Sequence, residues 1–81
     1  MPDDILTPWY RFGDGFQRGR VDNNVNADIF NAGHGWDWRV SRLTSEGTIS
    51  LAVGSTPVGM DRDTALVEAQ AAATAALLAA Q

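Results

Sequence analysis

The sequence predicts an α+β fold in which a small antiparallel β-sheet of three to five strands packs one face against one C-terminal α-helix. The first observation behind this prediction is the alternation of apolar and polar residues in short segments between residues 9 and 54. The second is an Ala-rich segment at 61–80 whose apolar residues recur at helical spacing. Because 81 residues can build only one small core, we treat 1–81 as a single domain.

The chain is expected to begin with a flexible arm at residues 1–8, which hold two prolines and two adjacent aspartates and have little to bury. Residues 9–12 then suit a strand. Gly13-Asp14-Gly15 predicts a turn, because glycine tolerates a positive φ angle. A strand that resumes at Phe16 completes a hairpin and opens the β-rich part of the chain, 9–54.

The segment from Val21 to Ile29 alternates almost strictly, which predicts a half-buried strand. Its even positions are all polar: Asp22, Asn24, Asn26 and Asp28. A competing interpretation places a turn at Asp22-Asn23-Asn24, because short polar side chains favour turns. The sequence leaves both interpretations open.

Two further strands are expected on either side of a four-residue hairpin loop at 44–47. Trp36, Trp38 and Val40 share one face of the first strand. Ile49, Leu51 and Val53 share one face of the second. The cross-strand pairs that this loop predicts are Leu43 with Thr48, Val40 with Leu51, and Trp38 with Val53. The residues expected on the opposite, wetter face are Asp37, Arg39, Ser41, Thr48 and Ser50.

Asp61 is a good N-cap for a helix that runs almost to the C-terminus, within 61–80. One sector of this helix holds small and apolar residues and should pack on the sheet: Leu66, Ala69, Ala73, Ala76, Leu77 and Ala80. Val67 and Leu78 lie on an adjoining flank. Either the N-terminal arm covers this flank or a partner does, such as a second copy in a homodimer.

The charge balance favours a basic protein partner. Ten carboxylates against six arginines give a net charge of −4, which disfavours general attraction to nucleic acid and to anionic membranes. The sequence also has no cysteine, no apolar run long enough to span a bilayer and no basic-then-apolar start. We therefore expect a cytoplasmic protein.

The sequence contains no recognisable catalytic apparatus. His34 is its only histidine and lies between two glycines, without other residues at metal-ligand spacing. The serines lack the context of a nucleophile elbow, and the glycines form no phosphate-binding loop. We therefore expect no enzymatic activity, no catalytic residue, no metal and no cofactor.

Basic and aromatic residues interleave between residues 10 and 20, a pattern typical of proteins that bind single-stranded nucleic acid. The residues that would carry such binding are Tyr10, Arg11, Phe16, Arg18 and Arg20. A competing interpretation assigns Trp9, Phe12 and Phe16 to the core and lets the arginines balance the acidic body of the protein. The net charge favours this second interpretation.

The candidate partner-binding residues are acidic and amide side chains expected on an exposed sheet face or at a turn: Asp14, Asp22, Asn24, Asp28 and Asp37. Carboxylates form charge-assisted hydrogen bonds with the Arg and Lys side chains that otherwise hold phosphates. Such a patch could therefore occupy a nucleic-acid-binding surface of another protein. The alternative is an ordinary solvated strand face.

Three features together resemble small phage-encoded anti-CRISPR proteins: the segment Gly35-Trp36-Asp37-Trp38-Arg39-Val40, a hairpin that ends in Leu51-Ala52-Val53-Gly54, and an acid-capped Ala-rich helix from Asp61 to Ala80. This resemblance implies a non-enzymatic inhibitor that binds a CRISPR effector of the Cascade type and blocks its access to target DNA. It assigns no role to individual residues. A structural phage protein is an alternative.

Overall fold

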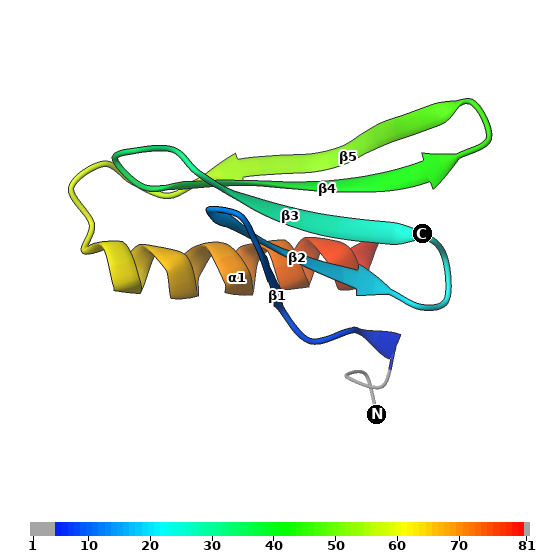
Figure 1. Cartoon of the computed structure of the whole chain (residues 1–81), viewed down its shortest axis with the longest axis horizontal. Helices are drawn as coiled ribbons and strands as arrows, with labels where there is room; N and C mark the ends of the chain where they lie inside the picture. Colours follow the sequence, from blue (N-terminus) through cyan, green and yellow to red (C-terminus); the bar gives the residue numbers. More distant parts are fainter. Residues whose placement is uncertain (1–4, 81) are drawn as a thin grey trace.

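Residues 5–80 are described by a computed structural model, and over this range five strands and one helix form an α+β fold. The strands are β1 (Tyr10–Phe12), β2 (Gly15–Arg20), β3 (Val25–Asn31), β4 (Trp36–Thr44) and β5 (Gly47–Ser55), and the helix is α1 (Arg62–Ala79). The strands lie in chain order in one antiparallel sheet, and α1 packs along one face of it (Figure 1). The predicted fold class is confirmed.

The core lies between α1 and the centre of the sheet. Val25, Ala27 and Ile29 alternate along β3 toward the helix and are fully buried. The helix residues that face them and are fully buried are Ala65, Ala69, Ala73 and Leu77. Small alanine side chains let the helix lie close to the sheet. The buried sector is rotated from the predicted one: it includes Ala65, whereas Leu66, Ala76 and Ala80 are only half-buried.

Both ends of α1 are satisfied by side chains. At the N-terminus, the Asp61 carboxylate accepts hydrogen bonds from the backbone N–H of Thr64 at 3.2 Å and from its hydroxyl at 3.3 Å, which confirms the predicted N-cap. At the C-terminus, the Arg20 guanidinium donates to the carbonyl oxygens of Leu77, Leu78 and Ala80. A cation placed here also suits the negative end of the helix dipole.

The prediction of one continuous strand from Val21 to Ile29 is wrong for its first four residues. Residues 21–24 form a turn, and β3 begins at Val25. Asn24 has a φ angle of 57°, a left-handed conformation that asparagine tolerates better than most residues. The competing interpretation, a turn at Asp22-Asn23-Asn24, is therefore confirmed.

The β4–β5 hairpin has the predicted pair Leu43 with Thr48, but its register shifts beyond that point. Leu51 is an extra residue in a β-bulge, so Val40 pairs with Ala52 and not with Leu51. Trp38 consequently pairs with Gly54 instead of Val53. A side chain at residue 54 would collide with the Trp38 indole, so the glycine makes room for this ring.

The hairpin loop is also shorter than predicted, because Thr44 and Gly47 pair with each other and leave a two-residue turn. As a result of the bulge, Ile49 and Val53 lie on opposite sheet faces, although the sequence placed them on one. Ile49 pairs with Arg42 on the helix side of the sheet, and Val53 pairs with Arg39 on the other side.

The end of the expected arm is held against β2. The backbone N–H of Thr7 donates to the carbonyl of Gly19 at 3.0 Å, and that of Val21 donates to Ile5 at 2.8 Å. Between them Leu6 is buried in the core, although we expected little to bury in this part of the chain. The first half of the expected arm, residues 1–4, lies outside the described residues.

Candidate binding surface on the open sheet face

The sheet face opposite α1, which we call the open face, is covered by no other element of residues 5–80. The strand register places a row of cross-strand neighbours along it: Tyr10, Gln17, Asp28, Arg39 and Val53. In a second, parallel row Phe12 pairs with Gly15, and Phe30 pairs with Asp37. The two rows bring together residues that lie far apart in the sequence.

Aromatic rings stand exposed on this face. Phe12 keeps 70% of its surface exposed, and Tyr10 and Phe30 are exposed as well. The Tyr10 and Phe12 ring centroids lie 6.4 Å apart. The Arg39 guanidinium carbon lies 5.6 Å from the centre of the Phe30 ring, which is within the range of a cation–π contact. The assignment of Phe12 to the core is therefore wrong, because it lies on the uncovered side of β1.

Hollows lie on both sides of Phe30. The larger, of about 460 Å³, extends from Phe30 to Phe12 over Gly15 and is also lined by Asp14 and Asp28. The smaller, of about 320 Å³, is lined by Phe30, Asp37, Arg39, Val53 and Ser55 among others. A side chain at residue 15 would collide with the backbone carbonyl of Ile29, so the glycine lets β2 lie close to β3 beside the larger hollow. Each hollow therefore combines apolar walls with a carboxylate.

Of the predicted binding residues, Asp14, Asp28 and Asp37 come together around these hollows. Asp14 and Asp37 are exposed and Asp28 is half-buried. One Asp28 oxygen accepts a hydrogen bond from the Gln17 side chain at 2.9 Å, which fixes the carboxylate beside the larger hollow. Arg39 is the cross-strand partner of Asp28 on the same face. Three aspartates and one arginine line the two hollows, so the surface around them is more acidic than basic.

Asp22 and Asn24 do not belong to this group. They lie in the turn between β2 and β3, and Asp22 forms an ion pair with Arg20 at 2.6 Å. The hydrogen bond from the Arg20 side chain lowers the pKa of the Asp22 carboxyl below its usual value of 3.8. Because Asp22 is already paired within its own chain, it is a poorer candidate for an external partner than Asp28 or Asp37.

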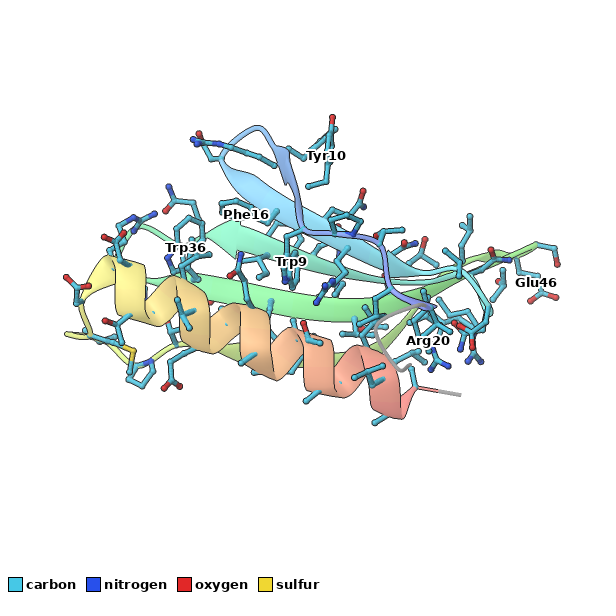
Figure 2. All side chains as sticks on the ribbon, turned by 90° about the horizontal axis from the view of Figure 1, so that it is seen from below. Trp9, Tyr10, Phe16, Arg20, Trp36 and Glu46 are labelled. Carbon is cyan, nitrogen blue, oxygen red and sulfur yellow. The ribbon has the colours of Figure 1, made fainter. Side chains whose placement is uncertain are left out.

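Of the three arginines between residues 10 and 20, Arg18 and Arg20 are engaged inside the molecule. Arg18 donates to the Thr7 carbonyl at 2.7 Å and to the Thr74 hydroxyl at 3.0 Å, and its guanidinium lies over the Trp9 ring. Arg20 binds the C-terminal end of α1, as described above, and Figure 2 shows it there. Phe16 packs against Trp36 with 5.9 Å between ring centroids. Tyr10 and Arg11 remain exposed.

The helix flank predicted from Val67 and Leu78 borders a shallow apolar groove of about 530 Å³. Gln70, Ala71, Thr74 and Ala75 of α1 also line this groove, and Trp9 lines it from outside the helix. Val67 keeps 65% of its surface exposed, so the segment at Trp9 borders the flank without covering it.

His34 is exposed in the loop between β3 and β4. Within residues 5–80, no group of three or more His, Cys, Asp or Glu side chains is placed to hold a metal ion. The helix of this range, α1, is not long and apolar enough to cross a bilayer.

Sequence reasoning named Tyr10 as a candidate binding residue but missed Phe12 and Phe30. Phe30 follows the buried Ile29 directly, so the alternation of β3 already places it on the side away from the core. Comparisons of this chain with protein-family models, curated proteins and solved structures found no match.

Proposed function

We propose that this chain is a non-enzymatic binding protein and that its open face docks on a basic surface of another protein. The observation that carries the proposal is an uncovered sheet face on which exposed rings of Phe12 and Phe30 flank hollows lined by Asp14, Asp28 and Asp37. Exposed apolar patches rimmed by polar groups are typical of protein interaction sites. The carboxylates select a cationic partner.

Arginine is the partner side chain that suits this face best. Its planar guanidinium stacks on aromatic rings and forms paired hydrogen bonds with a carboxylate. A guanidinium that enters the larger hollow can meet the Phe12 and Phe30 rings and the carboxylates of Asp14 and Asp28 together. The net charge of −4 speeds the approach of a basic surface over longer distances.

The specific action that we propose is inhibition of a CRISPR effector of the Cascade type. Such an effector holds nucleic acid on arginines and lysines, which are the side chains that carboxylates can occupy in place of phosphates. Binding of the open face there would block access of target DNA. This part of the proposal rests on the resemblance drawn from the sequence, together with the acidic open face.

A second candidate function is binding of single-stranded nucleic acid on the same face. Tyr10, Phe12 and Phe30 are exposed rings on an open sheet, an arrangement on which bases can stack. Phosphate contacts on this face would fall mainly to Arg39, since Arg11 lies on the other side of β1 and Arg18 and Arg20 are engaged inside the molecule. The carboxylates beside the rings oppose phosphate binding, so we rank this function second.

The test is a competition experiment with a purified Cascade-type effector and its labelled target DNA. We expect the wild-type chain to prevent formation of the effector–DNA complex, and the double variant D28K/D37K to lose this effect. The matched control is E46K/E68K, which likewise replaces two carboxylates by lysine and so changes the net charge equally, but at exposed positions away from the open face. Glu46 lies at the tip of the β4–β5 hairpin (Figure 2).

The control separates local recognition from general charge, because both variants raise the net charge from −4 to zero. Inhibition that survives D28K/D37K, or that both variants lose equally, contradicts docking through the open face. If the wild-type chain leaves the effector–DNA complex intact, the anti-CRISPR action is wrong. If the chain itself shifts labelled single-stranded DNA at low salt, the second candidate function is favoured.

A further inference from the structure

β5 is an exposed edge of the sheet. It pairs with β4 on one side, and no strand within residues 5–80 pairs with its other side. Its outward backbone N–H and C=O groups can therefore accept another strand. Nearly all of its residues are exposed, including the large apolar Ile49, Leu51 and Val53. The opposite edge differs, because β1 has only three residues and the preceding Ile5 to Thr7 bind along β2.

This edge also lies in an uncharged part of the chain. Residues 47–60 contain no Asp, Glu, Lys or Arg. Natural sheets usually protect an edge with charged side chains, and here only the bulge at Leu51 interrupts the strand. Two copies of a chain with net charge −4 repel each other across their carboxylates. β5 is the long strand at which they can approach with the least repulsion.

We propose that β5 pairs with β5 of a second copy of this chain, antiparallel, through residues 51–55 with Val53 at the twofold axis. The two sheets then join into one continuous sheet. The bulge at Leu51 sets one end of the paired segment, because the local twist of a bulge diverts the strand beyond it. Val53 also lines the smaller hollow of the open face, but this inference does not depend on the partner proposed there.

The sheet faces restrict the register to one in which a residue lies at the twofold axis and meets its own copy. A twofold axis perpendicular to the sheet keeps both open faces on the same side, so paired residues must point to the same face. Val53 lies on the open face beside Arg39 and would meet its own copy there. Ala52 would meet Gly54, and both lie on the helix side of the sheet. These small side chains leave space for the joint, and α1 packs mainly under β3 and β4 instead of β5.

Light scattering and sedimentation equilibrium at increasing protein concentration test the dimer. We expect the wild-type mass to rise from 8.7 kDa to twice that value. V53K should lose the dimer, because it places two ammonium groups against each other at the axis. V67K is the matched control and should keep the dimer, since Val67 and Val53 have similar exposed fractions, 65% and 68%. Circular dichroism should show that both variants fold, because neither side chain is buried.

Disulfide crosslinking tests the register independently, because the chain has no cysteine of its own. Residues directly opposite in an antiparallel pair have Cα atoms about 4.5–5.5 Å apart, within the range of a disulfide. V53C should therefore form a covalent dimer under mild oxidation, whereas I49C, outside the paired segment, should stay mostly monomeric. A wild-type chain that stays monomeric, a dimer lost in V67K but kept in V53K, or equal crosslinking of V53C and I49C would overturn the proposal.

Discussion

Replacing Arg20 by methionine should destabilise the fold strongly, because this side chain joins β2 to the C-terminal end of α1. Its guanidinium donates to Ala80 at 2.6 Å, to Leu77 at 3.2 Å and to Leu78 at 3.4 Å, and only 12% of the side chain is exposed. Methionine keeps most of the apolar stem, so R20M removes mainly the cation and its hydrogen bonds.

The expected cost of R20M is about 2–3 kcal/mol. A hydrogen bond to a charged group contributes roughly 1.5–3 kcal/mol, and a cation at a helix C-terminus roughly 0.3–1 kcal/mol. We count little more than one full hydrogen bond because all three carbonyls share one guanidinium nitrogen, which has only two N–H groups, and the longest contact is weak. For a domain of this size, each kcal/mol lowers Tm by about 4–8 °C, which gives a shift of about 10–20 °C.

Urea unfolding followed by circular dichroism measures this cost. The control is R39M, because Arg39 is exposed on the open face and contacts the Phe30 ring, and this variant should change the free energy of unfolding by less than about 0.5 kcal/mol. If R20M is no less stable than R39M, the guanidinium contributes nothing measurable at the helix end and the reasoning is refuted.

Three further predictions concern the core, the bulged hairpin and the turn. L77A should cost about 2–5 kcal/mol of unfolding free energy because Leu77 is fully buried, while L78A on the exposed flank should cost less than about 1 kcal/mol. G54A should cost about 1–3 kcal/mol through collision with the Trp38 ring, and a double-mutant cycle with W38L should recover part of that loss; additive effects would contradict the contact. The lowered pKa of Asp22 means that its carboxylate stabilises the fold at pH values above 3.8, and that this contribution is lost as the pH falls through the lower folded-state pKa. Urea midpoints of the wild type and D22N should therefore differ near neutral pH and converge in strong acid, and a constant difference would contradict the pairing with Arg20.

Much of the architecture could be predicted because local patterns decide it. The alternation of Trp36, Trp38 and Val40 places these side chains on the helix side of β4, as expected. Asp61 caps the helix because a carboxylate there satisfies free backbone N–H groups, whatever the rest of the fold does. Such features depend only on residues that are close to each other in the sequence.

The errors arose where distant residues decide the outcome. The bulge at Leu51 brings Gly54 instead of Val53 opposite the Trp38 ring, and no local pattern in β5 reveals this. Arg20 lies in a basic and aromatic stretch that is typical of nucleic-acid binding. In the fold, however, its side chain reaches from β2 to the end of α1 and binds Leu77, which is 57 residues away in the sequence. Asp22 and Asn24 lie apart from Asp14, Asp28 and Asp37 for a local reason, the turn at 21–24, which was one of the two interpretations that the sequence left open.

The central claim is that the open face recognises a cationic protein surface, and titration of ¹⁵N-labelled protein with an arginine-rich peptide at physiological salt tests it most directly. We expect saturable amide shifts centred on Asp28, Phe30 and Asp37, absent in D28K/D37K and retained in E46K/E68K. Shifts that centre instead on α1 around Glu68, or that stay unchanged in D28K/D37K, would contradict the claim.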